Sequence, residues 1–331
     1  MINLRNIWRP ETYHGFGKHP PFFEGWYFKM VDATEQHRYA IIPGVFIGAE
    51  WNSSHAFVQT LDGVTGRSTY HRYPFEAFVA AQDRLDIRVG PNRFRRDVIS
   101  LDIAGAQQTV QGELRFAGGH PWPVTLTSPG IMGWYALVPF MECYHGVLSF
   151  DHAISGQLTV DGETLDFSGG RGYIEKDWGQ SFPQAWIWMQ SNHFGVPGTS
   201  LTASVAIIPW LRNSFTGFIA GLWHEGRLYR FATYTGARIE RQETTDQSVT
   251  LHYVDGGRKG HRLEIVATRA HGGLLHSPER VAMLQRVTES LTATIRVRLV
   301  ELDSGRVVFE DEGRHAGLEV VGDLPALGAS A

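Results

Sequence analysis

The sequence predicts an all-β protein built from two antiparallel domains, and three observations lead to this expectation. The chain has 331 residues, more than a single domain of roughly 100–200 residues usually contains. It is rich in glycine (37 residues) and in aromatic residues, which suits strands joined by tight turns. Short β-type runs alternate with turn clusters along its whole length. We expect one β domain over residues 1–170 and a second over residues 171–331, with antiparallel strands of the kind found in barrels or sandwiches.

In the first half, apolar and β-branched runs are separated by Gly, Pro, Asn or Asp. The predicted strands are residues 23–29, 39–47, 55–61, 85–89 and 110–116. An Asp161-Gly162 pair then divides residues 157–160 from residues 164–167, which is a strong hairpin signal because Asp-Gly favours a two-residue turn.

The second half repeats this style. The predicted strands are residues 217–222, 227–234, 248–254 and 261–267. In the last ladder Ile295, Val297 and Leu299 alternate with two arginines, as expected for a half-buried strand.

One short helix is predicted before that ladder. Ser277 can cap it and Pro278 suits its first position. Val281, Leu284 and Val287 would then form its apolar stripe.

Composition excludes several classes of protein. A net charge of −4 argues against nucleic-acid binding, and the lone Cys143 excludes an intrachain disulfide framework. The first ten residues lack the apolar run of a secretory signal, so we expect a cytoplasmic protein. The longest apolar stretch, residues 203–211, is far shorter than the roughly 20 residues that span a bilayer.

Known cofactor motifs are also missing from the sequence. There is no Gly-x-Ser-x-Gly elbow, Walker loop, strand-linked dinucleotide fingerprint or zinc-type histidine spacing. We therefore expect no cofactor and no metal.

The first segment that carries chemistry is residues 22–29. At strand spacing Glu24, Trp26 and Phe28 share one face, while Tyr27 lies on the other. A carboxylate between two aromatic side chains is unusual on a solvated surface. The alternative is a core strand in which Glu24 is salt-bridged near the strand end.

The second segment is residues 172–183, where three charged residues precede a Trp-Gly pair without a regular period. This pattern favours neither a strand nor a helix, so we expect a special backbone conformation. Gly179 would supply positive φ or a close approach, and Pro183 would close the turn. The alternative is a structural turn in which Glu175 and Lys176 form a surface ion pair of little energetic worth.

The third segment, residues 184–194, has two different faces at strand spacing. One face carries two indoles and three amides, namely Gln184, Trp186, Trp188, Gln190 and Asn192. This combination is typical of a ligand-cavity wall, apolar with a few placed hydrogen-bonding groups. The opposite face is suited to packing, and His193 falls on it as a buried, hydrogen-bonded histidine rather than a catalyst.

These three segments closely resemble the tocopherol cyclase family. The matching motifs are Phe23-Glu-Gly-Trp-Tyr-Phe-Lys29, Glu175-Lys-Asp-Trp-Gly179 followed by Ser181-Phe-Pro183, and Trp186-x-Trp-x-Gln-x-Asn192. The resemblance covers essentially the whole chain. It has one departure, since Asp177 stands where plant cyclases tend to have Asn.

The resemblance implies a fold and an activity. Family members consist of two lipocalin-like or β-sandwich-like domains with a ligand cavity near their junction, so the domain over residues 171–331 is expected to be a lipocalin-like β-barrel. Tocopherol cyclases are cofactor-free isomerases that convert a phytylated benzoquinol to a chromanol. Related proteins include carotenoid hydratases and decalin-forming cyclases.

Cyclisation of a prenylated quinol requires an acid that protonates the alkene. A carboxylic acid with a pKa near 4 is ionised at neutral pH, so burial must raise the pKa of the donor. Asp177 is the first candidate, with Glu24 and Glu175 as alternatives. The Lys176 amine would oppose such a shift if it pointed inward.

The remaining site residues are expected to bind substrate. Indole faces can stabilise the tertiary cation, and the amides can orient the quinol oxygens. The expected substrate-binding residues are Trp26, Tyr27, Trp178, Trp186, Trp188, Gln190 and Asn192.

We therefore expect the small-molecule partner of the protein to be a hydrophobic prenylated quinol or a related isoprenoid. Transient contact with a membrane is compatible with such a lipid, although no amphipathic anchor stands out. Three alternatives stay open: a carotenoid hydratase-like enzyme, a pericyclic isoprenoid or polyketide cyclase, and a non-catalytic carrier of a hydrophobic ligand.

Overall fold

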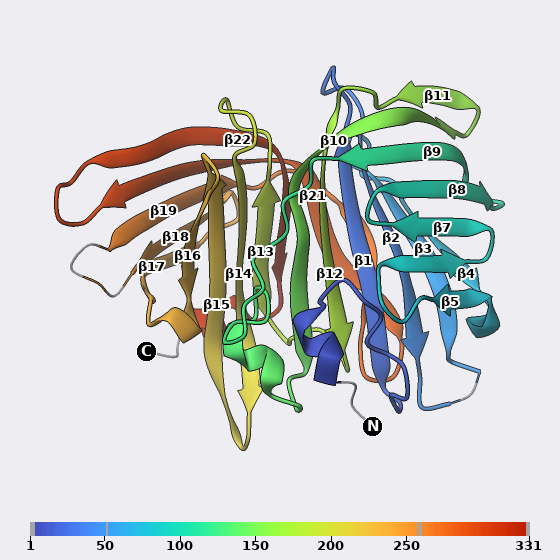
Figure 1. The fold of residues 1–331 in the computed structure, drawn as a ribbon, viewed down its shortest axis with the longest axis horizontal. Helices are drawn as coiled ribbons and strands as arrows, with labels where there is room; N and C mark the ends of the chain where they lie inside the picture. Colours follow the sequence, from blue (N-terminus) through green and yellow to red (C-terminus); the bar gives the residue numbers. More distant parts are fainter. Residues whose placement is uncertain (1–3, 51, 256, 258–259, 329–331) are drawn as a thin grey trace. The chain divides into compact units, whose positions relative to one another are not determined.

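The computed structural model describes residues 4–50, 52–255, 257 and 260–328, and it is nearly all antiparallel β-structure (Figure 1). This confirms the predicted fold class. The chain forms two compact units: Met1–Phe182 with Gly273–Val287, and Pro183–Gly272 with Thr288–Ala331. No helix in the described residues combines the length and apolarity needed to cross a bilayer.

The first unit contains one large sheet. Its strands are β1 (Phe22–Val31), β2 (Arg38–Ile47), β3 (His55–Asp62), β4 (Ser68–Tyr73), β5 (Phe78–Ala80), β6 (Asp86–Val89), β7 (Asn92–Arg95), β8 (Val98–Ala104), β9 (Thr109–Ala117), β10 (Cys143–Val160), β11 (Glu163–Asp166) and β12 (Arg171–Gly179). Three short 3₁₀ helices accompany them: η1 (Leu4–Trp8), η2 (Phe75–Ala77) and η3 (Gly133–Leu137). The strand β20 (Gly273–Pro278) also belongs to this unit.

The strand β12 has a central place in this sheet. The order β4-β3-β2-β1-β12-β10-β9-β8-β7-β6-β5 places it between two antiparallel meanders, with β1 on one side and β10 on the other (Figure 1). Both of its edges are therefore hydrogen-bonded to neighbouring strands. A side chain on β12 is consequently flanked by side chains from β1 and β10 on whichever face it occupies.

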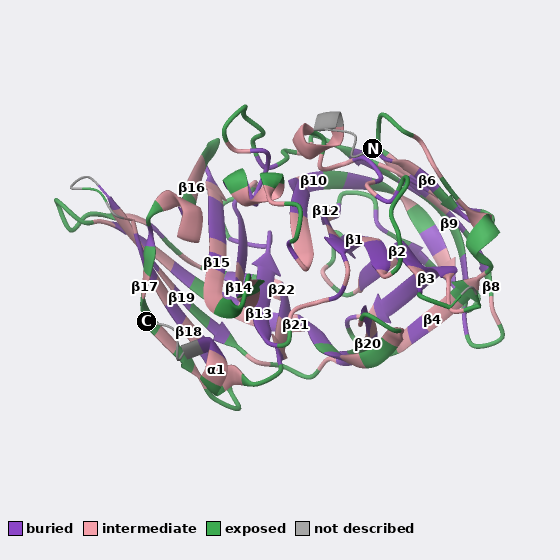
Figure 2. Ribbon diagram, turned by 90° about the horizontal axis from the view of Figure 1, so that it is seen from below, coloured by how far each residue is buried: buried purple, intermediate pink, exposed green. Residues whose placement is uncertain are grey.

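One apolar core fills the first unit. Phe28 of β1 contacts Phe94 of β7 and Phe116 of β9, with ring centroids 5.8 and 6.2 Å apart. Because these strands are far apart in the sheet order, the sheet must curve so that one face encloses the core. Figure 2 shows buried residues along the central strands of the unit.

The second unit contains its own sheet. Its strands are β13 (Trp186–Ser191), β14 (Ser200–Trp210), β15 (Asn213–His224), β16 (Arg227–Ala232), β17 (Arg238–Thr244), β18 (Ser248–Val254), β19 (His261–Thr268), β21 (Met283–Glu301) and β22 (Val307–Val321). The strand β21 starts in the first unit, and a 3₁₀ helix η4 (Thr233–Thr235) and a helix α1 (Leu324–Gly328) complete the elements. Stacking of Phe218 on Tyr253, at 5.2 Å, joins β15 and β18 across the core.

The expectation of a closed barrel in the second half is wrong. The strand order is β16-β15-β14-β13-β22-β21-β19-β18-β17, and the end strands β16 and β17 are not paired with each other among the described residues. The chain between them forms η4 instead of a ladder. The predicted boundary after residue 170 precedes β12, whereas β12 pairs with β1 and β10 and so lies in the first unit.

Most predicted strands are present, and the hairpin at Asp161-Gly162 forms between β10 and β11. The predicted helix over residues 278–287 is wrong. This stretch is a turn, with the Glu279 amide donating to the Ala282 carbonyl, followed by the start of β21. Of the expected apolar stripe only Val287 is buried, because Val281 is 71% exposed and Leu284 is 45% exposed.

The segment over residues 172–183 also differs from expectation, because most of it is the regular strand β12. Its charged residues are compatible with a buried strand since each has a partner on its own face. The close approach predicted at Gly179 is confirmed. Its φ is +156°, and a Cβ there would lie 2.2 Å from the carbonyl oxygen of Glu142.

Replacing Gly179 by alanine should therefore destabilise the protein. The added methyl group meets backbone, so the strand itself must shift. The control is Gly162→Ala, because Gly162 also has positive φ but open space around its Cβ position. We expect Gly179→Ala to lower the free energy of unfolding by about 1–3 kcal/mol more than the control, measured by urea denaturation. Equal losses would contradict the close approach.

Candidate active site

The two faces of β12 carry different chemistry. In the register with β1, Lys176 is opposite Trp26 and Trp178 is opposite Glu24, so these side chains share one face. Alternation places Glu175 and Asp177 on the other face. Three consecutive charged residues are thereby divided between two environments.

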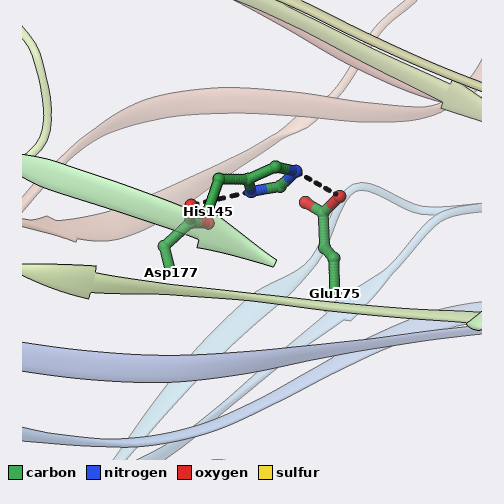
Figure 3. A group of neighbouring side chains, drawn as sticks. All are labelled: His145, Glu175 and Asp177. Atoms are coloured by element: carbon green, nitrogen blue, oxygen red, sulfur yellow. Dashed lines mark hydrogen bonds and ion pairs between the residues drawn. The ribbon is translucent and has the colours of Figure 1, made fainter. Parts of the chain in front are cut away.

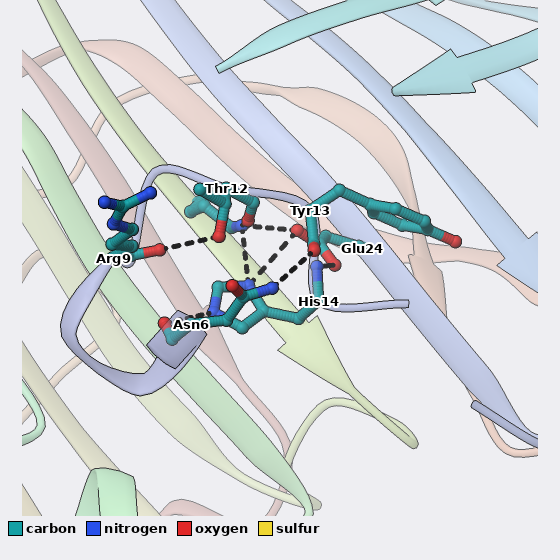
Figure 4. Close-up of polar contacts among 7 residues, drawn as sticks. Asn6, Arg9, Thr12, Tyr13, His14 and Glu24 are labelled. Atoms are coloured by element: carbon teal, nitrogen blue, oxygen red, sulfur yellow. Dashed lines mark hydrogen bonds and ion pairs between the residues drawn. The ribbon is translucent and has the colours of Figure 1, made fainter. Parts of the chain in front are cut away.

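The first environment is a buried polar cluster around Lys176 (Figure 4). The side chains of Lys176 and Glu24 have no exposed surface, and they form an ion pair. The Lys176 Nζ also donates to the Thr12 carbonyl at 2.6 Å and contacts His14 Nδ1 at 3.1 Å. The three protons of the ammonium thus have three acceptors, which is the condition for burying it.

Charge states in this cluster follow from these contacts. Burial acts to raise the pKa of Glu24, but the Lys176 charge and the His14 contact outweigh it and lower that pKa. Burial and Lys176 lower the pKa of His14, so its imidazole is neutral at pH 7. A neutral His14 accepts at Nδ1 from Lys176 and donates from Nε2 to the Asn6 carbonyl at 3.2 Å.

Aromatic rings surround the Lys176 ammonium. Its Nζ lies 4.7 Å from the ring centroids of both Trp26 and Trp178, a favourable cation–π distance. The Trp178 ring also stacks on His14 at 4.2 Å and on Tyr144 at 5.5 Å, with interplanar angles of 7° and 9°. The indoles of Trp26 and Trp178 therefore already contact a protein cation.

The second environment is formed by His145, Glu175 and Asp177, called here the histidine triad (Figure 3). His145 comes from β10, opposite Asp177 in the register. Its Nδ1 is 2.9 Å from Asp177 Oδ1, and its Nε2 is 3.5 Å from Glu175 Oε2. Glu175 is fixed in turn by the Tyr173 hydroxyl, which donates to it at 2.6 Å.

The two carboxylates hold a proton on His145. Burial alone would lower the pKa of His145, but the charges of Asp177 and Glu175 raise it to about 9. His145 is therefore an imidazolium at neutral pH. Its Nδ1 bonds to Asp177, whereas its buried Nε2 has no hydrogen-bond partner among the described residues.

The triad brings three metal-type donor atoms within 4.8 Å of one another. However, its histidine presents one nitrogen to each carboxylate instead of directing all donors to one point. A metal would require the donors to converge at about 2.0–2.2 Å from a single ion. The arrangement suits a shared proton better than a metal.

A pocket of about 470 Å³ lies in the first unit beside these groups. Its polar and aromatic wall includes His14, Tyr144, His145 and Trp178. Its volume falls within the range of small-molecule sites, about 300–1,000 Å³. His145 of the triad and the aromatic stack of His14, Tyr144 and Trp178 thus line the same pocket.

Sequence reasoning missed His145 and His14. His145 is 32 residues from Asp177, and His14 is 162 residues from Lys176, so no local spacing signals either contact. Only the pairing of β10 with β12, and the course of the chain before β1, bring them together.

Of the other predicted residues in this unit, Tyr27 lies opposite Glu175 in the register of β1 and β12. It is on the triad face of the sheet, as alternation requires, and is buried. Its expected role in substrate binding stays a prediction.

The predicted wall residues of the third segment lie in the second unit. Trp186, Trp188 and Gln190 share one face of β13, while Ile187 and Met189 pack in the core, as predicted. The Trp186 Nε1 donates to Glu319 at 2.6 Å. Beyond the strand, Asn192 contacts His193, with 3.1 Å between Oδ1 and Nδ1, so His193 is buried and hydrogen-bonded as expected. A ligand-binding role for this wall stays a prediction.

Comparison with known proteins agrees with the motif resemblance. The family model described as tocopherol cyclase-like matches residues 101–322. A chloroplastic tocopherol cyclase of Zea mays is 26% identical over 384 residues, covering 96% of this chain and 78% of the relative.

Solved structures share the fold. A crystal structure of an AttH-type protein from Nitrosomonas europaea has a TM-score of 0.53 at 13% identity, covering 90% of this chain and 92% of that one. The structure of CghA with Sch210972 has a TM-score of 0.54 at 11% identity, covering 92% and 89%. At these identities the likeness concerns the fold alone.

The buried ion pair generates a stability prediction. Lys176→Met would leave Glu24 buried without its counter-ion, so we expect a loss of about 3–5 kcal/mol in the free energy of unfolding. Adding Glu24→Gln should recover part of that loss. Arg241→Met, which breaks the exposed pair with Glu243, is the control and should cost less than about 1 kcal/mol. A Lys176 variant as stable as the control would contradict the role assigned to this pair.

The histidine triad generates a pH prediction. The pKa of His145 is raised to about 9 in the folded protein, against about 6.5 when unfolded. The stabilisation is therefore complete below pH 6.5 and is lost as the pH rises through about 9, with an amplitude of roughly 3 kcal/mol. Urea denaturation of wild type and His145→Gln across this range should show the decline only in wild type. Parallel curves would refute the triad's charge state.

Proposed function

This chain belongs to the tocopherol cyclase-like family, and from that premise we propose that it is an enzyme that cyclises a prenylated benzoquinol to a chromanol. The observation that carries the proposal is an imidazolium held between two carboxylates at the wall of a pocket. Substrate and product of this cyclisation are isomers, so the reaction itself consumes no redox equivalent.

The proposed proton donor is the imidazolium of His145, a residue that lines the pocket. Its N–H bond breaks as the proton forms a C–H bond with the less substituted alkene carbon, leaving a tertiary cation. The phenol oxygen then forms the C–O bond, and its released proton returns to His145. Atoms and charge balance over the cycle.

Electrostatics favours this donor. Proton transfer from an imidazolium to an alkene moves one positive charge instead of creating a new ion pair. Asp177 and Glu175 stabilise that charge before the transfer and stay close to it afterwards. In this mechanism Asp177 positions His145 and stabilises charge, in place of donating the proton itself.

Glu24, which was also a candidate acid, is assigned a structural role. Its carboxylate is ionised against Lys176 and fully buried, so it has no proton to give at neutral pH. We assign it to holding Lys176 and the backbone of His14, whose amide donates to Glu24 at 2.8 Å. Trp178 and Tyr144 then offer aromatic surface to the substrate from the pocket wall.

Product analysis tests the activity. Purified protein is incubated anaerobically with reduced 2-methyl-6-phytyl-1,4-benzoquinol, followed by chiral chromatography and mass analysis. A single-enantiomer chromanol isomeric with the quinol is expected. A product heavier by one water would indicate a hydratase, and stoichiometric binding without conversion would indicate a carrier.

Variants test the assigned roles. His145→Gln should lower kcat by about 10²–10⁴-fold because it removes the proton donor. Wild-type activity should fall above pH 9, where His145 loses its proton, and Asp177→Asn should shift that limb to lower pH. The control is Asp246→Asn, an exposed carboxylate of the second unit. If Asp177→Asn leaves the pH of this activity loss unchanged and turnover within about threefold of wild type, the positioning role assigned to Asp177 is wrong.

A further inference from the structure

We propose that residues 121–141, together with Phe16, form a bilayer-contacting surface through which a lipid substrate enters the pocket. This inference rests on the proposed function, since it concerns how a prenylated quinol dissolved in a membrane reaches the site. It commits to one partner, the surface of a lipid bilayer.

The composition of the segment is the first observation. From Pro121 to Met141 the sequence contains no Asp, Glu, Lys, Arg or His, although 19% of the whole chain is charged. Such an uncharged run normally occurs in a core strand. Here it contains only the short helix η3 and a single bridge between Val124 and Pro129.

The exposure of its side chains is the second observation. Leu126 is 86% exposed, Leu137 is 45% exposed and Val124 is 40% exposed. The same segment is held in place by buried side chains, including Trp122 and Ile131. The segment thus exposes apolar side chains while its backbone is anchored by buried ones. This combination is typical of segments that insert shallowly into a membrane surface.

Continuity with the pocket is the third observation. Leu137 and Phe16, which is 46% exposed, are both surface residues and pocket-lining residues. Five further apolar side chains of the segment lie along the same wall, namely Pro129, Met132, Ala136, Val138 and Pro139. An isoprenoid chain could therefore pass from the exposed surface to the pocket while remaining against apolar side chains.

Charge at the pocket suits an anionic bilayer. Lys18 lines the pocket and is exposed, and Arg9 is exposed near the same turn of chain. Glu11 is the carboxylate between them, so the local balance is positive on a chain whose net charge is −4. Basic residues beside apolar tips add attraction to anionic lipid headgroups.

Vesicle flotation tests the surface. Full-length protein is mixed with phosphatidylcholine vesicles containing or lacking phosphatidylglycerol, and the floated fraction is measured. We expect wild type to float, more so with phosphatidylglycerol, and Leu126→Glu to reduce the partition coefficient by at least about tenfold. The matched control is Leu211→Glu, because Leu211 is 82% exposed in the second unit and should leave flotation unchanged.

Turnover separates this inference from the proposed function. With a water-soluble short-chain prenyl quinol, Leu126→Glu should keep wild-type turnover, while with the phytyl quinol in vesicles its rate should fall with its binding. Failure of wild type to float, or equal loss in Leu211→Glu, would overturn the membrane surface. Flotation lost in Leu126→Glu without turnover in any protein would support the surface and refute the proposed activity.

Discussion

The buried ammonium of Lys176 is the constraint on which the candidate site depends. A charge without exposed surface is tolerated only if each of its protons has an acceptor, and here these come from Glu24 on β1 and from Thr12 and His14 before it. The segment preceding β1 is thereby fixed against β12. That fixation places His14 on Trp178 and so builds one wall of the pocket.

The central position of β12 explains how one short stretch supports two opposite electrostatic environments. Neighbouring strands on both edges supply flanking side chains to each face, and alternation sends Lys176 to one face and its two acidic neighbours to the other. Each face then acquires a compensating partner, Glu24 for the cation and His145 for the acids.

Much of the fold follows from the sequence, because most strands are local apolar runs bounded by turn residues. The hairpin at Asp161-Gly162, the packing face of β13 and the close approach at Gly179 were predictable for this reason. The strand β12 was not, since its charges resemble a loop until their partners are known. His145 is found only through the register of β10, and the apparent helix over residues 278–287 had periodicity without a surface to pack against.

The division of the chain into units has a consequence for how the protein is made. The first unit includes β20, where the Gln59 side chain bonds to both backbone groups of His276 and Ser68 donates to the Leu274 carbonyl. A nascent chain must therefore be synthesised to residue 287 before the first unit is complete, and at that length the second unit still lacks β22. At about 5–20 residues per second, the first unit therefore waits several seconds longer than it would if it ended at Phe182, whereas the second unit ends at the same residue in either arrangement. The sheet of β1 to β12 can thus form early in synthesis, but the first unit gains its β20 contacts only after much of the second unit has been made.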